Sequence, residues 1–117
     1  MITKNGRLLA GELARYVGRT GAVDETCSLI VRHSVTLRRV AEMQCGDGIH
    51  SGEWVNANWE RLERRYDALV ARLSKLVAKL PETDSGRIEL VAGGDPRGFV
   101  VSLSVPTSNG PRMVGVE

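Results

Sequence analysis

The sequence has two cysteines, three lysines, no long apolar run and no large excess of either charge. Without an apolar stretch of roughly 18–20 residues, we expect no membrane span. Lys4, Arg7 and Glu12 interrupt the N-terminal segment that a secretion signal needs. Two thiols fit a reducing compartment, and a chain of 117 residues can bury enough surface to fold without disulfides or a metal. We therefore expect a cytoplasmic protein of a bacterial host, without a membrane partner.

The charge balance gives little sign of a dedicated polyanion binder. Sixteen Lys and Arg against fourteen Asp and Glu give a net charge of +2, far from that of a nucleic-acid coat protein. Thirteen of the sixteen cations are Arg. Arg suits planar anions and interfaces better than Lys, but a GC-rich genome produces the same bias, and we favour that explanation.

Length and composition predict one globular domain. Hydrophobic residues make up 42% and charged residues 26% of the chain, close to globular averages. No repeat or low-complexity segment divides it. We expect a single domain over residues 1–117, helical over 6–80 and β-structured over 86–116.

Three segments have the period of amphipathic helices. The first spans about 7–17, with a short strand over 1–5 as an alternative for the start of the chain. The second spans 24–45, with Asp24 as the N-cap candidate. The third spans 59–80 and ends before Pro81. Its apolar a/d seam holds for three heptads and consists of Trp59, Leu62, Tyr66, Leu69, Leu73, Leu76 and Leu80.

After Pro81 the apolar period changes from 3.6 to 2. Residues 88–92 and 99–105 alternate apolar and polar side chains, which predicts two strands. Asp95-Pro96-Arg97-Gly98 between them fits a type I turn, so the strands should form a hairpin. A third strand over 112–116 follows another turn. Because a two-stranded hairpin is marginal alone, its apolar face must pack on the second and third helices.

The expected fold is α+β: three helices, one of them long, with a C-terminal two- or three-stranded antiparallel hairpin packed on them. The expected core is Leu9, Leu13, Ile30, Val31, Leu37, Ala41, Leu62, Tyr66, Leu69, Leu73, Leu76, Leu90, Val101 and Leu103. The apolar seam of the third helix is longer than a small sheet can cover. We therefore also expect that a homodimer can form through this helix.

The possible metal ligands are Cys27, His33, Cys45 and His50. They lack the close ligand pairs of structural zinc sites. On a continuous helix Cys27 and Cys45 are roughly 27 Å apart, which also excludes a disulfide between them. Only Cys45 and His50, beside Asp47, could form a metal or thiol site, and we favour buried, unliganded cysteines over it. The glycine-rich segment there lacks the preceding strand and the Lys of a phosphate-binding loop. We expect no enzyme activity, cofactor or metal.

Two groups of arginines are candidates for partner binding. Arg32, Arg38 and Arg39, with His33 among them, lie on the second helix, and Arg61, Arg64, Arg65 and Arg72 lie on the third. Such groups can hold phosphates, with Trp54 or Trp59 for base stacking, which makes nucleic-acid binding the alternative function. Acidic residues interleave the second group, so we favour a solvated charged face.

Three features together resemble a group of small phage- and prophage-encoded proteins. These are Glu42-Met43-Gln44-Cys45-Gly46 at the end of a helix, Trp54 and Trp59 at the start of the next, and Asp95-Pro96-Arg97-Gly98 followed by an alternating strand. The resemblance covers about residues 30–105. It departs at Gly46, where the group usually has Asn, and it does not reach the first helix.

The resemblance implies a small accessory protein that binds and inhibits or modulates a host protein complex, such as a defence system, in the manner of anti-CRISPR proteins. Asp95 and Arg97 join the candidate binding residues because a hairpin tip on a rigid scaffold presents its side chains to a partner. Good turn chemistry is the simpler explanation of both. We expect a non-enzymatic protein-binding function.

Overall fold

The computed structural model describes residues 1–17, 23–95 and 98–116, and within them four helices and three strands. These are α1 (Lys4–Val17), α2 (Val23–Cys45), α3 (Gly52–Ala57), α4 (Trp59–Ala78), β1 (Glu89–Asp95), β2 (Gly98–Val105) and β3 (Arg112–Gly115). The predicted α+β class is confirmed, because the three expected helices, the hairpin and the third strand are all present. The short helix α3 was not expected.

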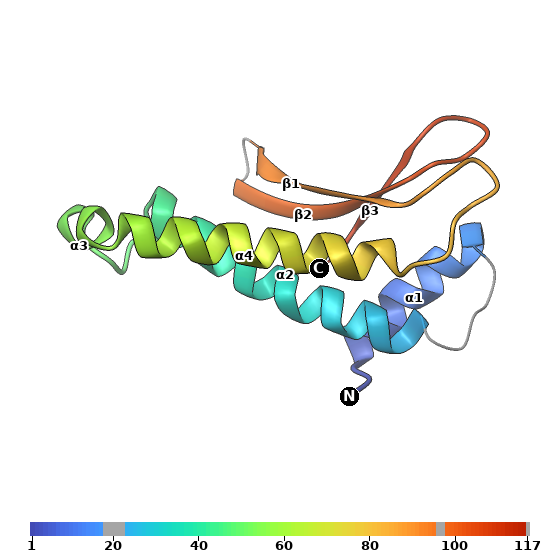
Figure 1. Cartoon of the computed structure of the whole chain (residues 1–117), viewed down its shortest axis with the longest axis horizontal. Helices are drawn as coiled ribbons and strands as arrows, with labels where there is room; N and C mark the ends of the chain where they lie inside the picture. The colour runs from blue at the N-terminus through green and yellow to red at the C-terminus, as the bar shows by residue number, and fades with distance from the viewer. Residues whose placement is uncertain (18–22, 96–97, 117) are drawn as a thin grey trace.

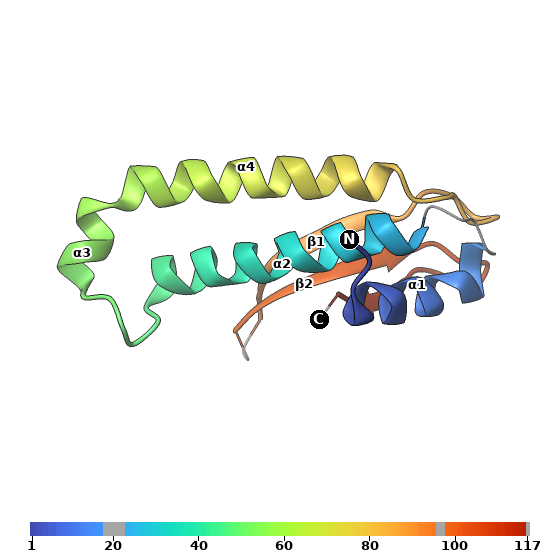
Figure 2. The same cartoon turned by 90° about the horizontal axis from the view of Figure 1, so that it is seen from below.

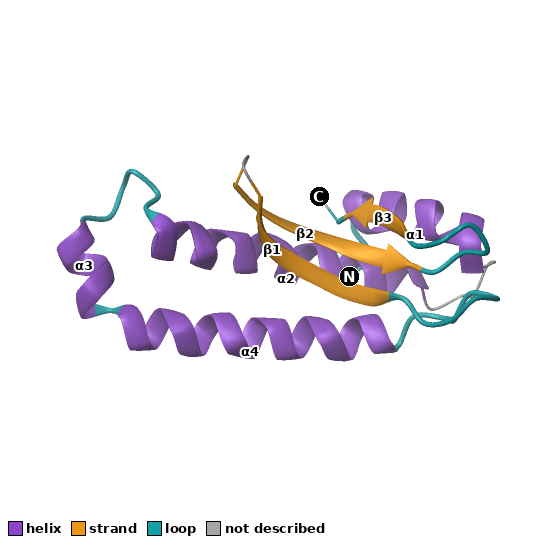
Figure 3. Cartoon of the chain, turned by 90° about the horizontal axis from the view of Figure 1, so that it is seen from above, coloured by secondary structure: helices purple, strands orange, loops and turns teal. Residues whose placement is uncertain are grey.

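Helices α2 and α4 run antiparallel and carry the sheet on one side (Figures 1 and 2). Helix α1 packs against α2, while β2 contacts α2 and β1 contacts α4. The strands are antiparallel in the order β1–β2–β3, with β1 nearer α4 and β3 nearer α1 (Figure 3). The expectation that the hairpin packs on the second and third helices is therefore confirmed.

The two faces of the sheet differ as the alternating pattern predicts. Leu103 in the central strand lies opposite Leu90 on one side and Val114 on the other, and its side chain is fully buried. Ser102 and Ser104, which point to the other face, are only half-buried. One face of the sheet thus covers the helices and the other lies toward solvent.

The main core cluster joins α1, α2, α4 and the three strands. All of the expected core residues are buried except Tyr66, Leu69 and Leu90, which are half-buried. Tyr66 lies edge-on to Phe99, with ring centroids 6.0 Å apart. The core also contains valines from the end of the sheet that were not expected there: Val105, Val114 and Val116.

The apolar seam of α4 packs mainly against its own chain. Leu62, Leu73, Leu76 and Leu80 are all buried, and α4 contacts both α2 and β1. Trp59, at 44% exposure, is the most open seam residue. The predicted homodimer through this helix thus has a smaller apolar surface available than the sequence pattern alone indicates, and it stays a prediction.

The alternative of a short strand over 1–5 does not hold. Helix α1 already begins at Lys4, because the Thr3 hydroxyl accepts a hydrogen bond from the Gly6 backbone N–H (3.0 Å). The Asp24 expectation was also wrong, since α2 begins at Val23 and Asp24 lies within its first turn.

A close backbone approach joins α1 to α2. Ser28 Oγ accepts a hydrogen bond from the Thr3 backbone N–H (2.9 Å) and donates one to the Asp24 carbonyl (2.8 Å). Gly6 is buried directly against this serine: a Cβ atom there would lie 2.0 Å from Ser28 Oγ and 2.5 Å from Ser28 Cα. Only glycine allows the two helices to approach this closely.

We therefore expect Gly6→Ala to destabilise the protein by about 1–3 kcal/mol, because the added methyl group must push α1 away from α2. Gly11→Ala is the matched control in the same helix: a Cβ at Gly11 meets nothing within 4 Å. This control should stabilise the protein by about 0.5–1 kcal/mol. Urea unfolding measures both, and equal stabilities for the two variants would contradict the close approach.

Candidate functional site

The ends of α2 and α4 project beyond the sheet and are joined by α3, forming a helical arm over residues 39–65 (Figures 1 and 3). Val40, Ala41, Val55 and Leu62 are buried, yet they do not belong to the main core cluster. They come from α2, α3 and α4. The arm therefore buries apolar side chains of its own outside the main core cluster.

The loop between α2 and α3 is organised by the Asp47 carboxylate. Its Oδ1 accepts hydrogen bonds from the backbone N–H groups of Ile49 (2.9 Å) and His50 (2.8 Å), and its Oδ2 lies 2.6 Å from His50 Nδ1. The backbone and side-chain hydrogen bonds from His50, followed by the one from Ile49, lower the pKa of Asp47 to about 2. Gly46 and Gly48 have positive φ angles of 96° and 74°, which lets the chain wrap around this carboxylate.

The loop leads directly into α3 through local contacts. The His50 ring lies against the Trp54 ring, with centroids 4.1 Å apart. Ser51 caps α3 by accepting a hydrogen bond from the Trp54 N–H (3.1 Å). Asn58 closes the helix, with its side-chain amide donating to the Trp54 carbonyl (2.9 Å). These bonds fix the backbone at the end of the arm.

This fixed end of the arm displays apolar side chains. Ile49 is 83% exposed and Trp59 is 44% exposed, while Trp54 is half-buried beneath His50. Both tryptophans of the chain thus lie here. We call Ile49, Trp54 and Trp59 the arm tip.

Cys45 and His50 are near in sequence but do not form a thiol–base pair. Cys45 is exposed, which corrects the expectation of two buried cysteines, whereas Cys27 is buried. Burial and the nearby Asp24 carboxylate raise the pKa of the Cys27 thiol to about 12. Within the described residues, the Cys45 thiol has no hydrogen bond, and no three His, Cys, Asp or Glu side chains gather as metal ligands.

The predicted arginines of α2 do not form one surface. Arg32 and Arg39 are exposed and lie seven residues apart, on the same side of the helix. Arg38 is half-buried instead, and its Nε lies 3.7 Å from a Glu42 oxygen. It also lines a pocket beneath β2 with Phe99. Arg38 therefore does not share the exposed surface of Arg32 and Arg39.

The arginines of α4 extend into a longer row of cations. At about 100° per residue, Arg61, Arg65, Arg72 and Lys79 fall within roughly 40° of one another around the helix, with Arg64 and Lys75 beside them. All six side chains are exposed. We call this row of six the basic stripe, and Lys75 and Lys79 were not among the residues predicted to hold phosphates.

The acidic residues that interleave these cations in sequence lie on another side of α4. Glu60, Glu63 and Asp67 are centred roughly 120° away from the basic stripe. Glu60 and Arg64 form no ion pair in the described structure; Arg64 Nε instead donates a hydrogen bond to the Glu60 backbone carbonyl (3.4 Å). The surface of α4 is thus divided into a basic side and an acidic side.

Neighbouring elements place the two sides of α4 in the fold. Ser74 and Ala78, on the acidic side, line a pocket with Ile88 and Leu90 next to β1. Arg72, in the basic stripe, instead acts on His33 of α2: burial, then Arg72, then Arg32 lower the pKa of this histidine. The basic stripe therefore lies on the α2 side of α4, away from the sheet.

The candidate residues at the hairpin tip are described only in part. Asp95 ends β1 and its backbone pairs with Gly98, which confirms the predicted hairpin. The side chain of Asp95, the type I turn at its tip and the whole of Arg97 lie outside the described residues. Their role in binding stays a prediction.

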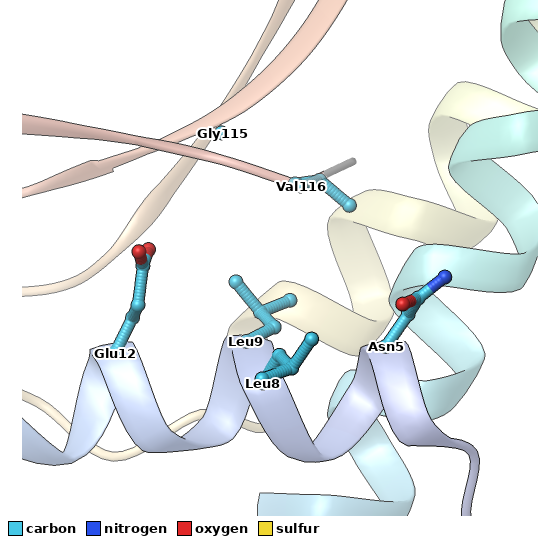
Figure 4. Close-up of a pocket in the computed structure, with 6 residues that line it drawn as sticks. All are labelled: Asn5, Leu8, Leu9, Glu12, Gly115 and Val116. Carbon is cyan, nitrogen blue, oxygen red and sulfur yellow. The ribbon is translucent and has the colours of Figure 1, made fainter.

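A pocket of about 290 Å³ lies between α1 and the end of the sheet. Figure 4 shows Asn5 and Glu12 extending from α1 on either side of Leu9, toward Gly115 and Val116. Glu12 is the one titratable side chain among the described residues that line this pocket. A carboxylate alone supplies neither a nucleophile–base pair nor a pair of carboxylates, so the pocket does not suggest a reaction.

No helix among the described residues is both long enough and apolar enough to cross a lipid bilayer. In comparisons with known proteins, no family model matches the chain, and neither curated proteins nor solved structures give a match. The assignment of function therefore depends on the surfaces described above.

The Asp47 contacts predict how the loop at the end of the arm responds to mutation and pH. Asp47→Ala should speed hydrogen exchange of the Ile49 and His50 amides by roughly tenfold, because both lose their acceptor. Because folding lowers the pKa of Asp47 from 3.8 to about 2, its contribution is complete above pH 4 and should be lost as pH falls toward 2. NMR measures the exchange rates of both amides. The control is Asp67→Ala, at an exposed position on α4, which should leave both rates unchanged. Equal effects of the two variants would contradict this role of Asp47.

Proposed function

We propose that this chain is a non-enzymatic binding protein that contacts a protein partner through the arm tip. The observation that carries the proposal is the gathering of Ile49, Trp54 and Trp59 at the end of a projecting, internally bonded arm. Tryptophan is among the residues most enriched in interface hot spots. Full burial of an exposed apolar side chain contributes about 1.5–3 kcal/mol, which makes Ile49 a second anchor.

The hydrogen bonds of the arm favour binding by a rigid surface. Asp47 holds the loop at its first half and Ser51 and Asn58 hold both ends of α3. Because these residues order the backbone before any partner arrives, association loses less conformational entropy than it would with a free loop.

We further propose that the partner is a host protein complex, such as a bacterial defence system, which the chain inhibits or modulates in the cytoplasm. This part follows from the resemblance of residues 42–46 and 95–98 to small phage-encoded proteins. Both cysteines are free, as suits a reducing compartment.

A pull-down with tip variants tests the proposal. Tagged protein is incubated with nuclease-treated lysate of the bacterium that carries the gene, and bound proteins are identified by mass spectrometry. We expect Trp59→Ala and Ile49→Ser each to lower the affinity for the partner about 30-fold or more, because each removes a hot-spot anchor of about 2 kcal/mol. Leu8→Ser and Met113→Ser are matched controls, because both side chains are more than half exposed and lie outside the arm.

Retention of the same partner by both controls, with loss in both tip variants, supports binding through the arm tip. A partner that is lost equally in all four variants, or that nuclease removes, would contradict it.

A further inference from the structure

We infer that the basic stripe of α4, Arg61, Arg64, Arg65, Arg72, Lys75 and Lys79, binds the phosphate backbone of double-stranded nucleic acid. This is an activity separate from protein binding by the arm tip. It assigns a ligand to a surface whose C-terminal half, from Arg72 onward, lies outside the arm.

The stripe is a concentrated field of positive charge on a protein whose net charge is only +2. None of the six side chains forms an ion pair with a carboxylate in the part of the chain that the structure describes. The Cβ atoms of members three or four residues apart, such as Arg61 and Arg65, are about 5–6 Å apart, within a Debye length of about 8 Å, so their charges repel each other. A polyanion laid along α4 relieves this repulsion.

The length of the stripe matches a regular duplex. From Arg61 to Lys79 it extends roughly 27 Å along one straight helix, at 1.5 Å per residue. That length corresponds to about eight base-pair steps of 3.4 Å. Four of the six cations are Arg, whose planar guanidinium can donate two parallel hydrogen bonds to a phosphate.

The composition of the stripe favours a duplex over other anionic partners. It contains no aromatic side chain, which single-stranded ligands need for base stacking, and Trp59 lies roughly 160° away around α4. Ala68, between Arg65 and Arg72, is small and exposed, so it leaves room for a backbone. The stripe also contains no large apolar side chain, whereas a helix that inserts into a lipid surface needs such side chains.

The Arg32 and Arg39 pair does not share this surface. Arg32 precedes His33 in the sequence, which places it about 100° from His33 around α2. Arg32 and Arg39 share one side of α2, whereas the stripe belongs to α4. This pair therefore provides a control with the same type of charge on a different helix.

Fluorescence anisotropy with a labelled 20-base-pair DNA duplex of arbitrary sequence tests the inference between 50 and 200 mM salt. For the unaltered protein, the plot of log K against log salt should have a slope near −5, since six neutralised phosphates give about −0.9 each. The triple variant Arg72→Gln, Lys75→Gln, Lys79→Gln should weaken binding at least tenfold at 100 mM salt and reduce the slope by about 3.

The matched control is Arg32→Gln, Arg39→Gln, Arg112→Gln, which removes three exposed positive charges outside the stripe. It should change affinity less than about threefold, and both triple variants should keep the helical circular dichroism and melting temperature of the parent. The tip variant Trp59→Ala should bind the duplex as the parent does, so this activity and the proposed protein binding can fail separately.

Three results would overturn the inference. One is the absence of duplex binding at 50 mM salt with 100 μM protein. Another is an equal loss of affinity in the control triple variant, which would reflect net charge alone. The third is stripe-dependent binding of polyglutamate or of a single-stranded 20-mer that is tighter than binding of the duplex.

Discussion

The fold depends on helix α2, which packs against other elements on three sides at once. Gly6 of α1 lies directly against its Ser28, α4 packs along its length, and β2 covers a third side. Small side chains make this possible, and Ser34 at its centre is fully buried with no hydrogen-bond partner for its Oγ among the described residues. An unpaired hydroxyl of this kind costs about 1–3 kcal/mol, so the surrounding apolar packing must outweigh it.

The arm is a consequence of unequal element lengths. A strand of eight residues, such as β2, spans about 26 Å, whereas the 23 residues of α2 span about 35 Å. The sheet therefore cannot cover the whole helix pair, and the remaining end needs another cover. Val55 of α3 and the hydrogen bonds of Asp47, Ser51 and Asn58 provide it. The same arrangement leaves Ile49 and Trp59 at the surface, so the closure of the arm and its proposed binding role involve the same residues.

The sequence predicted the parts of the structure that follow from periodicity. The period of 3.6 in α4, the period of 2 in β2 and the end of α2 at Cys45 are local properties. Helix α3 was missed because six residues carry no measurable period, although Ser51 three positions before Trp54 was an N-cap signal. The extent of the basic stripe, which continues to Lys75 and Lys79, was missed for another reason: charges that alternate along the sequence were taken to mix in space. At about 100° per residue, Glu63 and Arg64 lie on different sides of α4. What each side faces is shown only by the electrostatic effect of Arg72 on His33 and by the pocket that Ser74 lines.

The central claim is that α2 and α4 hold the arm out from the sheet as a rigid projection of one chain. Small-angle X-ray scattering of a dilute solution tests it directly. The radius of gyration of the Cα atoms is 15.4 Å and the molecule measures 48 × 32 × 20 Å, while a compact chain of this length has a radius of about 13 Å. At a dilution where the scattering mass is that of one chain, we predict a radius of gyration between about 15 and 17 Å once side chains and hydration are included, with a maximum dimension near 50 Å. A radius near 13 Å at that mass would show that the arm folds back against the sheet, and would contradict the account.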